Sequence, residues 1–173
     1  MAYISKTATP IGPFTVIADD DDTVLASGWT GDEERLLSYI ADRLVPETLV
    51  RRDSASPPTD AALAYHEGQL TAPDAIAVRY ASGPFLTAAW GALRKVDPGE
   101  VISYRELARR SGSPNAIRAA GSACARNPSA LFIPCHRVRR GDGTLGGFGY
   151  GLPVKRWLLD HEGPAGHDGR LPV

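Results

Sequence analysis

The stretch SYRELARRSGSPNAIRAAGSACARN, residues 103–127, carries the clearest structural signals in this chain of 173 residues. Ser103 and Glu106 have the spacing of a capping box, in which each side chain bonds a backbone N–H at the start of a helix. Gly112 is a natural helix stop. The Ser-Pro pair at 113–114 has the residue types of an N-cap and a first helical position. Two short helices around a tight turn predict a helix-turn-helix.

The second predicted helix is unusual because nearly all of its side chains are small. A helix that reads base edges in the major groove carries Asn, Gln and several Arg, whereas this one has a single long basic side chain, Arg118. Small residues allow close approach, which fits tight helix–helix packing and equally fits a narrow DNA groove read with little sequence preference. The small residues are Ala116, Ala119, Ala120, Gly121, Ser122 and Ala123.

The hydrophobic period changes near residue 80. Residues 1–30 alternate with a period of two, and the apolar runs are broken at TPIGP and DDDD, as in antiparallel hairpins. A helix is predicted over 33–44 and a loop over 51–60, whereas 61–82 is ambiguous. From residue 83 the period is helical, with one apolar face made by Phe85, Ala89, Trp90, Leu93 and Val96.

These patterns predict an α+β fold of two domains. Residues 1–80 form a small antiparallel sheet with a helix, and residues 81–173 form a mostly helical domain that contains the helix-turn-helix. The chain has 43% hydrophobic residues, enough for a folded core. It shows no signal peptide and no long apolar run, and two cysteines make no disulfide framework. We therefore expect a cytoplasmic protein.

A net charge of −1 hides a strong asymmetry along the chain. Residues 1–100 carry a charge of −7, and residues 101–173 carry +6. Between 101 and 140 there are eight arginines and one acidic residue, Glu106. Such a segment fits a polyanion such as nucleic acid, and it also fits an ordinary solvated basic surface.

LFIPCHRVRR, residues 131–140, contains the best candidate for a nucleophile. Cysteine attacks as a thiolate, and the basic groups around Cys135 are expected to favour that form. Adjacent side chains rarely face each other, so we expect His136 to act as a base through a water molecule. Such a histidine needs an orienting acid, and the candidates are Asp142, Asp160 and Glu162.

Other interpretations of the cysteines and glycines are less favoured. Cys124 lies among alanines and is expected to be a small buried apolar residue. Two cysteines 11 positions apart do not have the paired spacing of a zinc site. The glycine-rich segment 141–151 lacks the Gly-Lys-Ser/Thr ending of a phosphate loop, so we expect its backbone to line a pocket.

IPCHRV at 133–138 resembles the active-site motif of the O6-alkylguanine-DNA alkyltransferases, also called methylated-DNA–protein-cysteine methyltransferases. The resemblance extends through GEVISYRELARRSG, AIRAAGSACARNP and GGFGYGLPVKRWLLDHEG, and it covers about residues 83–163. It implies a DNA-repair methyltransferase that needs no cofactor or metal. Such a protein flips O6-alkylguanine, or less readily O4-alkylthymine, out of double-stranded DNA. It then transfers the alkyl group irreversibly to its own cysteine, so each molecule acts once, as a monomer.

The resemblance also assigns roles to individual residues. Cys135 matches the alkyl acceptor, His136 the base that acts through water, Glu162 the acid that orients it, and Asn127 a bracing residue. Tyr104 matches a tyrosine that crowds a phosphate, and Arg118 an arginine that replaces the flipped base in the stack. The expected minor-groove contacts are Tyr104, Arg118, Ala119, Gly121, Ser122, Arg126 and Arg137. The expected substrate pocket comprises Pro134, Val138, Phe148 and Gly149, with the carbonyls of Cys135 and Val138 and the amide of Gly149 on the guanine.

One departure from the family pattern lies in the expected pocket. Many members carry tyrosine where this chain has Phe148, which keeps an aromatic face but has no hydroxyl to help the guanine leave. Two alternative functions stay open: a binder of alkylated DNA that transfers nothing, and a cysteine hydrolase that merely contains a Cys-His pair. The retained Cys135 argues against the first.

Overall fold

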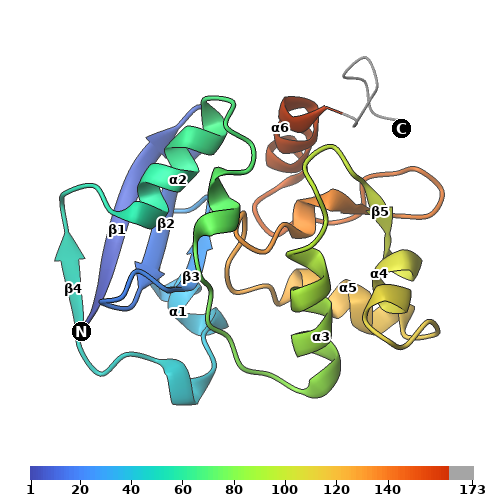
Figure 1. Ribbon diagram of the computed structural model, residues 1–173, viewed down its shortest axis with the longest axis horizontal. Helices are drawn as coiled ribbons and strands as arrows, with labels where there is room; N and C mark the ends of the chain where they lie inside the picture. The colour runs from blue at the N-terminus through green and yellow to red at the C-terminus, as the bar shows by residue number, and fades with distance from the viewer. Residues whose placement is uncertain (164–173) are drawn as a thin grey trace. The chain divides into compact units, whose positions relative to one another are not determined.

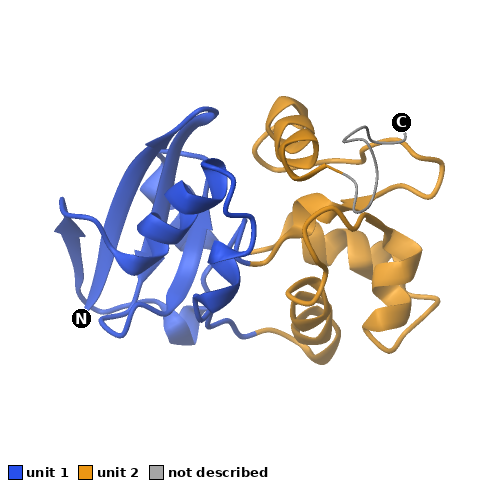
Figure 2. Cartoon of the chain, turned by 45° about the horizontal axis from the view of Figure 1, so that its top comes forward, with its two compact units in different colours: residues 1–81, 128–132 blue, residues 82–127, 133–173 orange. Residues whose placement is uncertain are grey.

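The computed structural model describes residues 1–163, which divide into two compact units (Figure 2). The first unit comprises Met1–Ala81 together with the internal segment Pro128–Phe132. The second comprises Ser82–Asn127 and the chain from Ile133 onward. Helices and strands occur in both units, so the predicted α+β class is confirmed.

The first unit is built on a four-stranded sheet in the order β3-β2-β1-β4. Strands β1 (Ala2–Thr9), β2 (Gly12–Ala18) and β3 (Val24–Gly28) pair antiparallel, as their alternating pattern predicts. Strand β4 (Leu49–Arg52) pairs parallel with β1, so the sheet is mixed. The predicted loop over 51–60 is wrong at both ends, because it overlaps β4 at its start and the helix Pro57–His66 at its end. This edge strand is largely exposed, which is why it shows no apolar alternation.

Two helices cover opposite faces of this sheet (Figure 1). Ile4 of β1 packs in the apolar cluster that includes Leu36 of α1 (Glu33–Tyr39), whereas the Ser5 hydroxyl bonds Thr59 of α2 (Pro57–His66). Neighbouring strand residues point to opposite faces, so the two contacts lie on different sides of the sheet. Helix α1 ends earlier than predicted because Ile40 adopts extended backbone, and short 3-10 helices follow at Asp42–Leu44 and Ala72–Ala75.

The segment Pro128–Phe132 corrects the prediction of two continuous domains. The backbone N–H of Ser27 donates to the Pro128 carbonyl at 2.9 Å, and the Ala130 N–H donates to the Ser27 carbonyl at 3.2 Å. These bonds attach the segment to β3, and the Phe132 ring packs against Phe14. The chain therefore returns to the first unit immediately before the cysteine motif.

The second unit contains four helices among the residues described: α3 (Pro84–Leu93), α4 (Tyr104–Arg110), α5 (Ile117–Ala125) and α6 (Leu152–Glu162). Two short strands, β5 (Ile102–Ser103) and β6 (Val138–Arg139), pair in parallel. The predicted face of α3 is buried at Ala89, Trp90 and Leu93. Within residues 1–163, no helix has the length and apolarity needed to cross a membrane.

The helix-turn-helix is present as α4 and α5, with two differences in detail. The Ser103 hydroxyl accepts from the Glu106 N–H at 3.0 Å, but the Glu106 carboxylate bonds Arg109 and Arg110 instead of completing the capping box. Helix α5 begins at Ile117, three residues later than the Ser-Pro signal predicts. Packing explains its small residues in part, since the Trp90 Nε1–H of α3 donates to the Ala123 carbonyl at 2.9 Å.

Candidate active site

Cys135 is the first residue of a short 3-10 helix, Cys135–Arg137, which follows Pro134. Its side chain opens on a cavity of about 240 Å³ formed by α4, α5 and the glycine-rich segment. The fold thus brings together five residues that the sequence singles out, Tyr104, Gly121, Cys135, Phe148 and Gly149. Cys124 lines the same cavity, which the prediction of a plain core residue missed. Pro134 and Val138 are buried beside it but do not line it.

Behind the cysteine, three charged or titratable side chains form one buried cluster. His136 Nε2 lies 2.7 Å from Glu162 Oε2, so among the candidate acids Glu162 is the one in contact. Arg137 donates to both Glu162 oxygens at 2.9 Å and to the Val96 carbonyl at 2.6 Å. The side chains of His136 and Glu162 are each only 1% exposed, so this cluster is shielded from bulk solvent.

The sequence predicts that Arg137 contacts DNA, but in the structure its side chain is buried. Its side chain is 4% exposed, and each of its three guanidinium nitrogens donates a hydrogen bond, two of them to Glu162 and one to the Val96 carbonyl. A buried carboxylate needs a partner of opposite charge, and a bidentate arginine supplies one. Arg137 thus holds in place the carboxylate that contacts His136.

The pKa values in the cluster indicate which groups are charged. Burial opposes ionisation of Glu162, but its bonds to His136 and Arg137 outweigh burial and hold its pKa below the usual range. Burial lowers the pKa of His136 and keeps the ring neutral. A neutral ring whose Nε2–H donates to Glu162 has a lone pair on Nδ1. Nδ1 has no hydrogen-bond partner among the described residues, as a base acting through water requires.

The thiol environment differs from the expected cluster of arginines. Burial raises the pKa of Cys135, while a hydrogen bond from Asn127 and the charge of Lys155 act in the opposite direction. Asn127 also donates from Nδ2 to the Ile133 carbonyl at 2.7 Å, which braces the chain just before the cysteine. The thiol of Cys135 is therefore protonated at neutral pH.

Lys155 of α6 is the charged residue that sequence reasoning missed. Its side chain is 0% exposed, and Nζ donates to the carbonyls of Val138 at 2.6 Å, Leu145 at 2.5 Å and Gly147 at 3.3 Å. Three bonds use all the donors of an ammonium group. The signal was present in the sequence, because Lys155 shares a helix face with the buried Leu158 and Leu159.

The outer side of α5 carries the side chains expected to meet DNA. Arg118, Ser122 and Arg126 are exposed, and Ala119 and Gly121 are half-buried. A Cβ added at Gly121 would meet no atom within 4 Å, so its small size is not required by packing inside the described protein. Tyr104, by contrast, packs closely on the glycine-rich segment, where a Cβ on Gly146 would lie 2.7 Å from the tyrosine oxygen.

Comparison with known proteins assigns the chain to a family. It is 35% identical over 160 residues to the methylated-DNA–protein-cysteine methyltransferase of Shigella flexneri, covering 91% of this chain and 94% of that protein. This chain belongs to the methylated-DNA–protein-cysteine methyltransferase family. The family model described as the DNA-binding domain of 6-O-methylguanine DNA methyltransferase matches residues 84–164.

Two further relatives of this family have different extents of similarity. The human methylated-DNA–protein-cysteine methyltransferase is 51% identical over 74 residues, which cover 43% of this chain and 36% of the human protein. The crystal structure of Mycobacterium tuberculosis OGT in complex with DNA matches with a TM-score of 0.78 and 31% identity, covering 92% of each chain. The similarity therefore extends over both units of this methyltransferase family member.

Lys155 offers a direct test of how this methyltransferase family member holds its active-site segment. Lys155→Met removes the ammonium and leaves three carbonyls without their donor, so we expect a loss of about 3 kcal/mol or more in the free energy of unfolding. Lys95→Met is a matched control, because Lys95 is exposed at the end of α3. Its cost should stay within about 0.5 kcal/mol. Urea denaturation of both variants checks this, and equal small losses would contradict the clamping role.

Proposed function

We propose that this protein repairs double-stranded DNA by transferring the alkyl group of O6-alkylguanine, and less readily that of O4-alkylthymine, to Sγ of its own Cys135. The transfer is irreversible, so each molecule acts once. The observation that carries the proposal is the position of Cys135, which lines a cavity directly in front of the buried His136–Glu162 pair. Membership of the methyltransferase family supports the same reaction.

The chemistry follows from the protonation states in the cluster. The Cys135 proton passes through a bridging water to Nδ1 of His136, and Glu162 stabilises the imidazolium that forms. Sγ then bonds to the alkyl carbon as the bond from that carbon to O6 breaks. The electron pair goes to the guanine, which takes up a proton and balances the one released by the thiol.

The damaged nucleotide has to leave the duplex before it reacts, because a base that is stacked in the duplex cannot enter the cavity that Cys135 lines. Flipping costs a few kcal/mol, and an inserted side chain offsets part of it. In our proposal α5 enters the minor groove with its small residues, Arg118 fills the gap in the stack, and Tyr104 presses on the neighbouring phosphate. The exposure of Arg118 and the open space at Gly121 support this approach.

Phe148 forms one wall of the cavity, and its side chain has no group that can hydrogen-bond the guanine. Its ring packs edge-on against Tyr150 with centroids 5.8 Å apart, and it presents an aromatic face without a hydroxyl. In this chain position 148 therefore provides contact with the base but no hydrogen bond to the leaving guanine. We propose that the backbone amide of Gly149, which lines the same cavity, contacts the guanine instead.

The decisive experiment is mass spectrometry of the protein after exposure to duplex DNA that contains O6-methylguanine. We expect one methyl group per protein molecule, located on the peptide that contains Cys135. Binding to the damaged duplex with no protein methylation would instead support a non-catalytic binder. Repeated turnover of a small ester or amide without DNA would support a hydrolase.

Arg118→Ala separates flipping from chemistry. We expect repair of O6-methylguanine in duplex DNA to slow about tenfold or more, because the flipped state loses the side chain that fills the stack. Reaction with the free base O6-benzylguanine needs no flipping and should keep its rate. Quenched-flow label transfer on the two substrates measures both rates. Equal loss on both would contradict the stack-filling role.

A further inference from the structure

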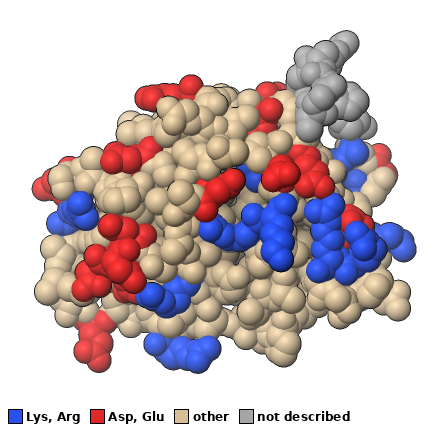
Figure 3. All heavy atoms as spheres, viewed as in Figure 1, with Lys and Arg blue, Asp and Glu red and all other residues tan. Residues whose placement is uncertain are grey.

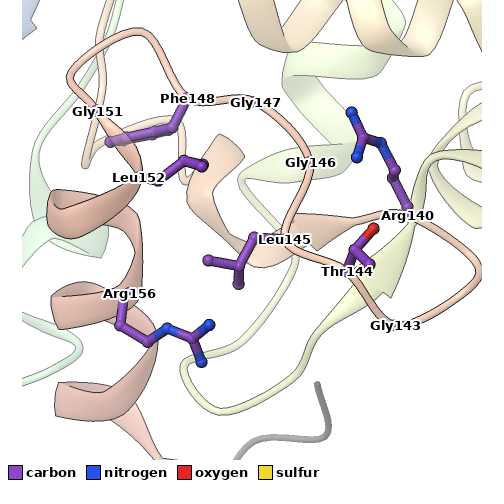
Figure 4. A pocket seen from close by; sticks show the side chains of 10 residues that line it. All are labelled: Arg140, Gly143, Thr144, Leu145, Gly146, Gly147, Phe148, Gly151, Leu152 and Arg156. Carbon is purple, nitrogen blue, oxygen red and sulfur yellow. The ribbon is translucent and has the colours of Figure 1, made fainter.

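A second, larger cavity lies against the same glycine-rich segment as the reaction cavity. Its volume is about 630 Å³, and its wall includes Arg140, Leu145, Leu152 and Arg156. Gly147 and Phe148 line both cavities, so the two cavities lie on either side of this backbone segment. Figure 4 shows Arg140 and Arg156 reaching from opposite walls with Leu145 between them. None of the chemistry proposed above uses this cavity.

Neither of the two arginines has a carboxylate partner among the residues that the structure describes. Both are exposed. Arg109 and Arg110, by contrast, are paired with Glu106. Figure 3 shows several Lys and Arg side chains gathered on one side of the face that it presents. The charge of Arg109 and Arg110 is compensated by Glu106, whereas the charge of Arg140 and Arg156 at this cavity is not compensated by an ion pair among the described residues.

Asp142, two residues after Arg140 in the chain, does not neutralise the cavity. The pKa of Asp142 is lowered mainly by hydrogen bonds from the hydroxyl and N–H of Thr144, with the charge of Arg140 contributing less. Its carboxylate is thus engaged within its own turn and does not line the cavity. The lining carries two positive charges and no negative one, so its ligand is anionic.

Apolar side chains between the arginines narrow the choice of ligand. Leu152 is 49% exposed at the start of α6, and Leu145 and Phe148 are half-buried beside it. A small inorganic anion would leave this surface uncovered. A sugar–phosphate backbone satisfies both features, because its phosphates bond guanidinium groups and its deoxyribose rings cover the leucines.

We propose that Arg140 and Arg156 bind phosphates of the DNA strand that carries the damaged base, next to the flipped nucleotide. This inference rests on the proposed function, since it places the flipped base in the Cys135 cavity. The backbone of that nucleotide stays at the mouth of the cavity, beside Gly147 and Phe148. The adjoining phosphates on the same strand then reach the cavity on the other side of this segment.

The first test is the salt dependence of binding to an O6-methylguanine duplex. Each phosphate contact contributes about 0.9 to the slope of log affinity against log salt concentration. We expect Arg140→Ala and Arg156→Ala each to lower the slope by about 1, and the double variant by about 2, between about 50 and 200 mM salt. Arg156→Lys should keep the slope. Arg43→Ala, which removes an exposed arginine of the first unit, is the charge-matched control.

The second test locates the contact by replacing single phosphates with uncharged methylphosphonates around the lesion. We expect one or two replacements on the damaged strand to weaken binding of the unmodified protein and to have no effect on the double variant. An unchanged slope in the double variant, or equal losses for both proteins, would overturn the inference. Reaction with the free base O6-benzylguanine distinguishes failure of this inference from failure of the proposed function. If the unmodified protein does not react with the free base, the proposed function is refuted and not the phosphate contacts.

Discussion

Cys135→Ser is expected to reduce methyl transfer from one group per protein molecule to none that can be detected. A serine hydroxyl is far less acidic than a thiol, and a neutral imidazole acting through water cannot generate its alkoxide at a useful rate. The cavity and the buried cluster should be unchanged, because the substitution alters a single atom. Binding to the damaged duplex is therefore expected to persist.

Cys124→Ser is the matched control for this experiment, because both thiols line one cavity. Burial raises the pKa of Cys124. A hydrogen bond from Asn127 favours the thiolate of Cys135, whereas no hydrogen bond lowers the pKa of Cys124. We expect the control variant to accept one methyl group at close to the normal rate. Radiolabel transfer followed by peptide mapping checks both variants, and label on Cys124 in the Cys135→Ser protein would contradict the assignment.

Glu162→Gln should have the second largest effect, on both stability and rate. The amide keeps the shape of the side chain but removes the charge that pairs with Arg137, which then remains buried without a counter-ion. Breaking such a pair costs about 3–5 kcal/mol. The imidazolium formed during transfer loses its stabilising carboxylate, so we expect repair to slow about a hundredfold or more.

The matched control is Glu106→Gln, which disrupts the ion pairs of a partly exposed carboxylate with Arg109 and Arg110. Ion pairs exposed to solvent contribute little to stability, so we expect a much smaller loss of stability and an unchanged repair rate. Urea denaturation and single-turnover label transfer give the two quantities. A Glu162→Gln protein as stable and as fast as this control would show that the buried cluster has no such role.

Acid sensitivity provides an independent check on the same carboxylate. The folded pKa of Glu162 lies below its unfolded value, so its stabilising contribution is present above about pH 4.3 and is lost as the pH falls further. His136 acts in the same direction from about pH 6.5 downward, because burial lowers its folded pKa. Unfolding free energies measured from pH 7 down to about pH 2 should therefore fall with acid, and Glu162→Gln should lose the part of that fall that lies below about pH 4.3.

Local signals in the sequence were sufficient for α1, α3 and the helix-turn-helix, but they missed α2, which begins inside the predicted loop. The Ser103 cap, the stop at Gly112 and the periods of two and 3.6 depend on neighbours within a few residues, and the structure contains the elements they predict. The start of α5 was wrong because Ser113 and Pro114 satisfy a capping pattern that the turn does not use. Strand β4 was missed because an exposed edge strand needs no apolar pattern.

What the sequence by itself determined is the set of candidate groups: a cysteine beside a histidine, three candidate acids, a helix-turn-helix and a basic C-terminal half. The tertiary structure alone decided which charges meet. It buried Arg137 on Glu162 instead of exposing it to DNA, placed Lys155 beneath the glycine-rich segment, and put Cys124 in the reaction cavity. The physical reason is that hydrogen-bonded helices and turns form from adjacent residues, whereas a buried charge is stable only beside a partner that the fold brings from far along the chain.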